Sequence, residues 1–267
     1  MKRAFCFALA LLMLSCTGCG AAPSPTSEPA PADARTPVPT VDAEPTPEPT
    51  PSPTSAPTPP PTELQETEDM GQEYLDSIVF YGDSNTNGLR LLELLPGGYG
   101  TNQIWTPMSG TLTLCYWDIN TIVYPETWTE MPVTDAMAEK QPEYLIINLG
   151  ENGISFMDED YFVSEYTEMV QALQEANPDT KIMLSSLYPV AASYPNQDDI
   201  NNEKIAAANG WIYEIAEATG TRYIDCGAAV RGEDGALPET LHDGGGYHLN
   251  ADAYALVLDY IRTHGYQ

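Results

Sequence analysis

The sequence predicts an α/β protein in which a mainly parallel sheet lies between two layers of helices. Four short apolar runs have the length of strands that are buried on both faces. The segments between them carry apolar residues at helical spacing. Strands that alternate with helices of this length imply a parallel sheet covered on both sides.

Each predicted element follows from its own pattern. The predicted strands are the apolar runs at residues 77–81, 144–149, 181–184 and 222–225. The helices predicted near residues 159–176 and 199–219 have their apolar residues on one stripe. A shorter helix is expected at residues 87–95. A last helix contains residues 253–261, and Asn250 is of the residue type that caps a helix N-terminus.

Polar residues follow two of the predicted strands directly. Asp83 and Ser84 come after the first strand, and Glu151 and Asn152 come after the second. In open sheets of this type, ligands bind at the carboxyl ends of the strands. We therefore expect the functional site at that edge of the sheet.

The charge of the chain narrows the classes of partner. Asp and Glu number 39 against 10 Lys and Arg, so the formal net charge is −29. Such a surface repels the phosphates of nucleic acids and of anionic lipids, which argues against both as partners. No apolar run after residue 20 has the length of a membrane span.

The N-terminus reads as an export signal. Two basic residues precede the apolar run 4–14, which is too short to span a membrane as a stable helix. Cys16 and Cys19 stand where cleavage is expected, in a context that resembles the lipobox of bacterial lipoproteins. We predict a signal peptide at residues 1–19 and favour Cys19 over Cys16 as the lipidated residue. An ordinary signal peptide is the alternative.

Residues 20–71 are predicted to be a disordered linker rich in Pro, Thr, Ser and Glu. Fifteen of the 24 prolines lie within residues 23–61, and no aromatic residue occurs between Phe7 and Tyr74. Proline favours extended polyproline II, and the segment has too little apolar surface to offset the entropy of folding. The folded domain is therefore expected at residues 72–267.

Two cysteines fall in the predicted domain, Cys115 and Cys226. In an exported protein, such a pair could form a disulfide. Two buried free thiols are an equal possibility, because cysteine without a partner behaves as a small apolar residue. The sequence leaves both open.

A serine and a histidine are the candidates for chemistry. Ser84 follows the first strand in a turn that exposes its hydroxyl and sets its N–H near a helix N-terminus. A serine hydroxyl is a poor nucleophile until a base takes its proton. His248 lies in the glycine-rich loop 241–249, which can place an imidazole over the serine, and Asp243 could orient that imidazole. Taken alone, such a loop is more often inert.

Three segments, in this order along the chain, resemble the SGNH, or GDSL, hydrolases. Residues 78–86 (IVFYGDSNT) resemble the first block of the family, and residues 148–152 (NLGEN) resemble the third. Residues 243–250 (DGGGYHLN) resemble the last block, before the C-terminal helix. The resemblance covers about residues 78–263. It implies a flavodoxin-like three-layer α/β/α sandwich and a serine esterase that needs no metal or other cofactor.

The resemblance also implies roles for the matching positions. Ser84 would be the nucleophile, His248 the base and Asp243 the acid that orients the base. The oxyanion would be held by the N–H of Ser84, by a glycine N–H and by the side-chain amide of Asn152. For the glycine we choose Gly110.

The chain departs from the family pattern in two places. The acid usually lies three residues before the histidine, where this chain has Gly245, whereas Asp243 lies five residues before it. We expect the wider loop still to bring Asp243 to the imidazole; otherwise a Ser–His dyad remains. Gly153 stands where the third block commonly has an aspartate, which concerns loop geometry more than chemistry.

The sequence therefore predicts an extracytoplasmic, lipid-anchored serine esterase. Its substrate would be a small-molecule or glycan ester, with removal of acetyl groups from polysaccharide as the narrower expectation. Trp105, Trp117 and Trp128 crowd the stretch 101–135 and could line a sugar cleft or form core. Two alternatives remain open: acyl transfer to a sugar hydroxyl, and a non-catalytic glycan-binding module on a hydrolase scaffold.

Overall fold

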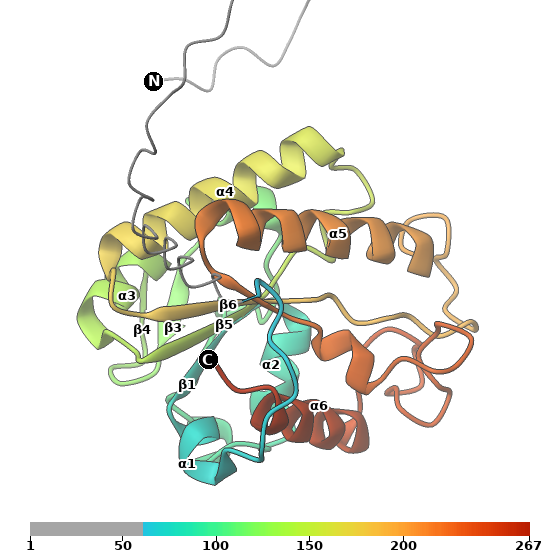
Figure 1. Ribbon diagram of the computed structural model, residues 1–267, viewed down its shortest axis with the longest axis horizontal. Helices are drawn as coiled ribbons and strands as arrows, with labels where there is room; N and C mark the ends of the chain where they lie inside the picture. The colour runs from blue at the N-terminus through green and yellow to red at the C-terminus, as the bar shows by residue number, and fades with distance from the viewer. Residues whose placement is uncertain (1–60) are drawn as a thin grey trace, which may run out of the picture. The chain divides into compact units, whose positions relative to one another are not determined.

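The fold is built on a five-stranded parallel sheet. The computed structural model describes residues 61–267. The strand order is β2-β1-β5-β6-β7, every neighbouring pair is parallel, and helices cover both faces (Figure 1). This confirms the predicted three-layer α/β/α class. The predicted signal peptide, with Cys16 and Cys19, and most of the predicted linker lie outside the described residues.

All four predicted strands are present, together with a short fifth one. The sheet consists of β1 (Ile78–Gly82), β2 (Ile104–Trp105), β5 (Tyr144–Asn148), β6 (Lys181–Ser185) and β7 (Arg222–Ile224). The helices are α1 (Gly71–Asp76), α2 (Ser84–Leu91), α3 (Val133–Lys140), α4 (Glu159–Ala176), α5 (Asn202–Thr219) and α6 (Ala251–Thr263). A separate antiparallel hairpin is formed by β3 (Ile122–Tyr124) and β4 (Thr129–Met131). Short 3-10 helices cover Gly98–Gly100, Leu114–Tyr116 and Cys226–Ala229.

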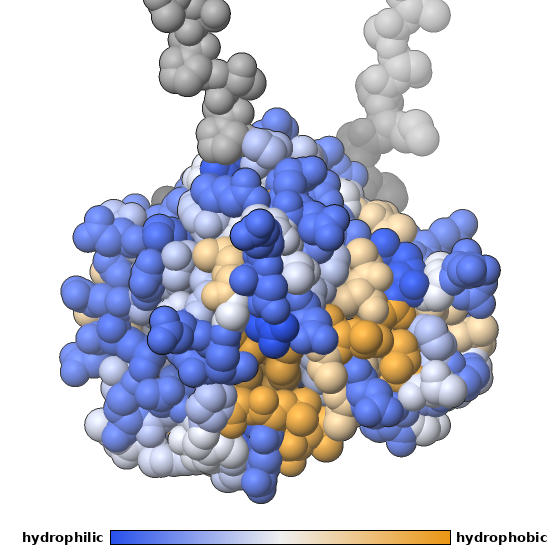
Figure 2. All heavy atoms as spheres, turned by 60° about the horizontal axis from the view of Figure 1, so that its bottom comes forward, coloured by the Kyte–Doolittle hydropathy of each residue, from blue (hydrophilic) through white to orange (hydrophobic). Residues whose placement is uncertain are grey.

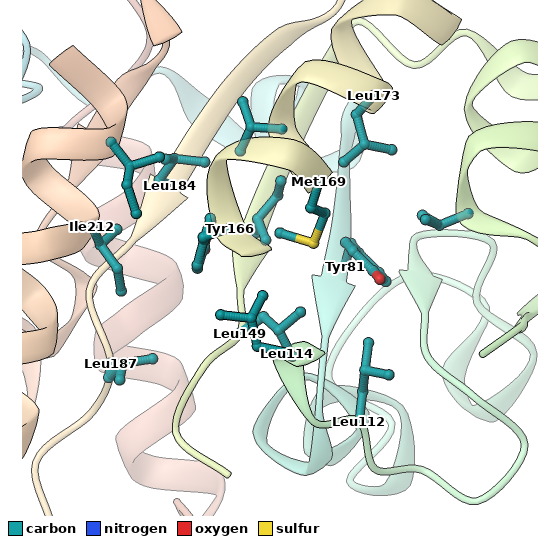
Figure 3. Packing of buried hydrophobic residues seen from close by; sticks show 14 of the residues in the cluster. Tyr81, Leu112, Leu114, Leu149, Tyr166, Met169, Leu173, Leu184, Leu187 and Ile212 are labelled. Atoms are coloured by element: carbon teal, nitrogen blue, oxygen red, sulfur yellow. The ribbon is translucent and has the colours of Figure 1, made fainter. Parts of the chain in front are cut away.

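The sheet separates two hydrophobic cores, as the side chains of β1 illustrate. Successive side chains of a strand point to opposite faces of the sheet. Val79 and Tyr81 belong to the core beneath α3, α4 and α5, whereas Ile78 and Phe80 belong to the core beneath α1, α2 and α6. Figure 3 shows part of the first core, with Tyr166 of α4 among its members. Both faces of the sheet are therefore buried, as the continuous apolar runs predict.

Side-chain caps set where the long helices begin. Asp158, Asn201 and Asn250 precede α4, α5 and α6, and each accepts a hydrogen bond at 3.0 Å from a backbone N–H in the first turn of its helix. Such a bond satisfies an amide that has no partner within the helix. The cap at Asn201 explains why α5 begins at residue 202 rather than near residue 199.

Helix α2 begins earlier than the sequence predicts. The expected helix covers residues 87–95, but α2 covers Ser84–Leu91. The physical reason is Asp83, whose carboxylate accepts from the N–H of Asn85 at 3.1 Å and caps the helix directly after β1. Ser84 is therefore the first residue of the helix.

The folded body also begins earlier than the predicted boundary at Gln72. Glu63 bridges to Tyr223 of β7, and the N–H of Leu64 donates to the Tyr223 carbonyl at 2.8 Å. Leu64 is buried in the core beneath α6. Residues 62–71, which the composition assigned to the linker, therefore belong to the folded body. Composition did not predict this, because a single buried leucine in a polar stretch has no periodic pattern.

The two cysteines of the domain are both free. Cys115 is buried in the core beneath α4, and Cys226 is buried in the core on the other face of the sheet. The structure therefore decides the open question in favour of two unpaired thiols. Within residues 61–267, no helix is long and apolar enough to cross a membrane.

Replacing Gly82 with alanine should destabilise the fold. Gly82 ends β1 against β5, and a Cβ there would overlap the Asn148 carbonyl oxygen and the Thr86 hydroxyl. Such overpacking against backbone lowers the free energy of unfolding by about 1–3 kcal/mol. Urea unfolding of the Gly82→Ala variant measures this loss.

The matched control is Gly210→Ala in α5. Nothing lies within 4 Å of a Cβ built at that position. Alanine in place of a helical glycine should raise the free energy of unfolding by about 0.5–1 kcal/mol. Equal effects of the two substitutions would contradict the close approach at Gly82.

Candidate active site

Strand β1 and helix α2 present Ser84 at the carboxyl end of the sheet. The strand ends at Gly82, Asp83 is the N-cap, and Ser84 is the first helical residue. The N–H groups of a first helical turn have no partner within the helix. The hydroxyl and the N–H of Ser84 therefore lie together where a helix N-terminus favours negative charge.

The loop before α6 brings His248 to Ser84. The His248 Nε2 lies 3.0 Å from the Ser84 Oγ, although the two residues are 164 positions apart. Backbone hydrogen bonds close this loop: the Asp243 N–H donates to the His248 carbonyl at 3.0 Å, and the Asn250 N–H donates to the Leu241 carbonyl at 3.1 Å. The two chemistry-bearing side chains thus come from opposite ends of the domain.

His242 holds the shape of this loop and is not the partner of the serine. Its Nδ1 accepts from the N–H groups of Gly244 at 2.9 Å and Gly246 at 3.2 Å, and its Nε2 lies 2.9 Å from a carboxylate oxygen of Glu239. An Nδ1 that accepts two N–H groups carries no proton, so Nε2 is the protonated nitrogen and donates to Glu239. Sequence reasoning missed this role, which has no motif.

Asp243 lies beside the imidazole of His248 at a long distance. Its Oδ2 is 3.6 Å from the His248 Nδ1, beyond the usual N–H···O range of about 2.7–3.2 Å. Its Oδ1 accepts from the N–H of Gly245 at 2.8 Å, so the carboxylate also caps the loop. Both side chains are about half exposed. The structure thus brings serine, histidine and aspartate into one row, with the aspartate the most loosely placed.

Asn152 lies next to the nucleophile turn. Its side-chain amide donates to the Leu112 carbonyl at 2.9 Å and lies 3.4 Å from a carboxylate oxygen of Asp83. Its Oδ1 accepts from the Tyr247 hydroxyl at 3.3 Å. The amide N–H groups therefore point toward Asp83, Thr111 and the Leu112 carbonyl, and Tyr247 fixes the amide orientation.

Gly110 lines the site, but its N–H is already engaged. This N–H donates to the Pro107 carbonyl at 2.8 Å in a turn, and Gly110 has a positive φ of 74°. In this conformation it offers no second backbone N–H to an oxyanion. The physical reason is the Pro107–Gly110 turn, which sequence alone does not distinguish from an open loop.

Two buried acids lie behind the site. Burial is the main cause that raises the pKa of Asp83 to about 7 and the pKa of Glu151 well above its ordinary value. The nearby Asp83 raises the pKa of Glu151 further, while the hydrogen bond from Asn85 opposes the shift. Neither carboxyl is exposed, so neither belongs to the row of residues that a substrate would meet.

A cleft of about 360 Å³ opens beside Ser84 and His248. Its polar lining residues include Asn87, Ser109 and Thr111. Its apolar lining residues include Leu91 and Leu92 at the end of α2, and these leucines are 59% and 45% exposed. Figure 2, which turns the lower side of Figure 1 forward, shows hydrophobic side chains gathered in one area of that face. The cleft can hold both a polar and an apolar part of a ligand.

A larger cavity of about 520 Å³ lies elsewhere, between α5 and the loop after β7. Its lining includes Tyr213, Asp225 and Arg231, and the last two form an ion pair at 3.0 Å. It contains neither the serine nor the histidine. Size alone therefore does not identify the candidate site, because the serine and the histidine both line the smaller cleft.

The aromatic residues of stretch 101–135 divide between core and surface. Trp105 is fully buried and Trp117 packs partly buried against the first core. Tyr116 and Trp128 are exposed, and Trp128 stacks on Tyr99 with ring centroids 6.3 Å apart. None of them lines the cleft beside Ser84.

A parallel sheet with a serine and a histidine at the carboxyl ends of its strands is the architecture of an α/β/α hydrolase. The chain belongs to the GDSL-like lipase/acylhydrolase family, whose model matches residues 76–256. The resemblance to SGNH and GDSL hydrolases drawn from the three sequence blocks is thereby confirmed. No curated protein matches the chain.

Solved structures share the fold. A proposed acylhydrolase from Bacteroides fragilis is 21% identical over 69% of this chain and 84% of its own, with a TM-score of 0.50. A DUF4886 family protein from Bacteroides uniformis is 15% identical over 71% of this chain and 83% of its own, also with a TM-score of 0.50. At these identities the likeness concerns the fold.

Proposed function

We propose that this protein is an extracytoplasmic serine esterase that works through an acyl-enzyme on Ser84. The observation that carries the proposal is the 3.0 Å distance from the Ser84 Oγ to the His248 Nε2. That is hydrogen-bonding distance for proton transfer from a nucleophile to its base. The membership of a hydrolase family supports the same reaction class.

The reaction would proceed in two steps. In the first, Ser84 Oγ attacks the ester carbonyl carbon while His248 Nε2 takes the hydroxyl proton. The bond from carbon to the leaving oxygen then breaks, and the leaving alkoxide takes the proton from His248. In the second, a water molecule gives its proton to His248, attacks the acyl-enzyme and releases the acid, and the proton returns to Ser84.

Asp243 and Asn152 would support these steps. The carboxylate of Asp243 would stabilise the imidazolium that forms on His248 and hold its orientation. The N–H of Ser84 and the amide of Asn152 would donate to the oxyanion. Because the Asn152 amide already donates to the Leu112 carbonyl, the Thr111 hydroxyl and the Asp83 carboxylate, the oxyanion would have to compete with these acceptors for an N–H bond.

The narrower proposal is that the substrate is an acetylated polysaccharide. Ser109 and Thr111, which line the cleft, supply hydroxyls that could meet those of a sugar. An export signal with lipidation at Cys19, or at Cys16, would hold the enzyme outside the cytoplasm where such polymers occur. Release of acetate from acetylated xylan, compared with hydrolysis of longer-chain nitrophenyl esters, tests this step. Faster cleavage of the longer chains would contradict it.

A fluorophosphonate probe and p-nitrophenyl acetate test the reaction class. We expect one covalent adduct on the peptide that contains Ser84, and hydrolysis that the probe blocks in proportion to labelling. Absence of both would contradict the proposal and would favour a non-catalytic binding module. Added sugar acceptors that capture the acyl group would instead reveal acyl transfer.

Replacing Asp243 with asparagine should lower kcat by about 10²-fold or more, because the imidazolium loses its nearby charge. The asparagine oxygen can still accept from the N–H of Gly245, so the loop keeps its cap. Kinetics on p-nitrophenyl acetate measure the effect, and thermal unfolding serves as the control for loop integrity. An unchanged kcat would leave a Ser–His dyad as the working site.

A further inference from the structure

Asn85, which follows the nucleophile, is hydrogen-bonded to three parts of the fold. Its N–H donates to Asp83, its carbonyl accepts from the Tyr254 hydroxyl of α6 at 2.6 Å, and its side-chain Nδ2 donates to Glu151 Oε2 at 2.9 Å. Asn85 and Glu151 are each 1% exposed. Glu151 directly precedes Asn152, so this contact joins the nucleophile turn to the turn that carries the side-chain amide.

Two atoms of this contact lack a partner. Within residues 61–267, Asn85 Oδ1 and Glu151 Oε1 are both buried without a hydrogen bond. An acceptor left unpaired in the interior is costly, because it has lost water and gained nothing. If Glu151 were ionised, both atoms would be acceptors and neither could satisfy the other.

We propose that Glu151 is a neutral carboxylic acid whose Oε1–H donates to Asn85 Oδ1, so that the two side chains form a ring of two hydrogen bonds that positions Ser84 relative to Asn152. The acid then supplies the one donor that the pair lacks. Within residues 61–267, Glu151 makes no hydrogen bond to Ser84 or His248, so it is a positioning residue rather than a catalytic one.

The surroundings of Glu151 favour the neutral form. The titratable groups that face it are the carboxyl of Asp83 and the phenols of Tyr188, Tyr247 and Tyr254. None of these carries a positive charge that could stabilise a carboxylate. Complete burial raises the pKa of Glu151 well above its ordinary value, in the same direction.

The first test compares Glu151→Gln with Glu151→Ala. A glutamine keeps the length of the side chain and can form the same two-bond ring, so kcat should stay within about threefold of the native value. An alanine removes both bonds and leaves the Asn85 amide unpaired. Its kcat should fall by about ten- to a hundredfold through misplacement of Ser84, with KM little changed. Equal losses in both variants would overturn the proposal.

The second test exchanges acid and amide. Asn85→Asp alone places two carboxyls in contact, so we expect a loss of kcat of about tenfold that grows as pH rises. The double variant Asn85→Asp, Glu151→Gln restores one acid and one amide at unchanged length and should recover most of the activity. A double variant no better than Asn85→Asp alone would overturn the proposal.

A third measurement does not depend on esterase activity. A carboxyl with a raised folded-state pKa binds its proton more tightly than in the unfolded chain, so native stability falls as pH rises above the unfolded-state value. The urea midpoint of the native protein should therefore decline relative to Glu151→Gln as pH rises above the unfolded-state pKa of about 4.3. Asp83 contributes to both curves, so the difference reports the titration of Glu151 together with its coupling to Asp83. If the urea midpoints of the native protein and of Glu151→Gln changed in parallel with pH, the proposal that Glu151 is neutral would be overturned.

The activity tests rest on the proposed esterase function, whereas the unfolding test does not. Absence of ester hydrolysis by the native protein would refute the proposed esterase function. The unfolding curves would still decide whether Glu151 carries its proton. If the alanine variant fails to fold, the Gln variant and the exchanged pair still decide the positioning role.

Discussion

Replacing Ser84 with alanine is expected to abolish ester hydrolysis and labelling by a fluorophosphonate. Without the Oγ no acyl-enzyme can form, and loss of a serine nucleophile lowers kcat by about 10⁵–10⁶-fold in comparable hydrolases. The hydroxyl contacts His248 at the surface of a cleft, so its removal should leave the fold intact. Initial rates on p-nitrophenyl acetate and a thermal unfolding curve measure the two effects.

Ser109→Ala is the matched control for this substitution. Ser109 lines the same cleft, is exposed, and its hydroxyl donates to the Thr111 carbonyl at 3.2 Å. On p-nitrophenyl acetate, which has no sugar hydroxyls for Ser109 to meet, we expect its kcat to stay near the native value. Substantial turnover by Ser84→Ala, with the control unchanged, would show that a different group attacks the ester.

Replacing His248 with alanine should reduce kcat to a similar extent, because Ser84 loses the group that takes its proton. Residues that act as one unit show similar losses when either is removed. The His248 side chain is about half exposed, so the free energy of unfolding should change by no more than about 0.5 kcal/mol. Added imidazole should restore part of the rate through the open cleft.

His242→Ala gives the contrasting signature. The His242 side chain is 7% exposed and accepts two backbone N–H groups of the loop, so its loss should lower stability as well as activity. Imidazole should not rescue this variant. If His248→Ala were the variant with the large loss of stability, His248 would be a structural residue and the proposed mechanism would fail.

The parts of the fold that sequence could predict are those with a repeating pattern. Strands β1, β5 and β6 carry apolar residues on both faces because both of their faces are buried, and α4 carries one apolar stripe because only one of its faces is buried. The two-residue strand β2 has no period to detect. It exists because Ile104 and Trp105 are held beside Phe80 and Tyr81 by the sheet.

The candidate site shows the same division between residues that a local pattern predicts and residues that no pattern predicts. Ser84 and His248 could be predicted, because a strand-to-helix turn and a loop before a helix leave short local motifs. The contacts of His242 with Glu239, and of Tyr247 with Asn152, could not, because they depend on how a widened glycine loop folds. The engaged N–H of Gly110 is likewise a matter of turn geometry.

Asn85 and Glu151 show why a buried polar contact escapes sequence reasoning. Asn85 follows Ser84 and Glu151 precedes Asn152, which the family resemblance singles out, yet neither residue type by itself predicts that the side chain is buried. Their hydrogen bond joins segments 66 positions apart. Only the packed arrangement of β1 and β5, which sets Gly82 against Asn148, brings them together.

The separation of Ser84 and His248 along the chain has a consequence for synthesis. Ser84 is made early in the domain, whereas His248 comes with the last loop and is held by the cap of α6. A growing polypeptide, or a fragment that stops ahead of α6, would carry an ordinary alcohol with no proton acceptor beside it. The proposed hydrolytic competence should therefore arrive in one step, once the segment that carries this loop and α6 has been made.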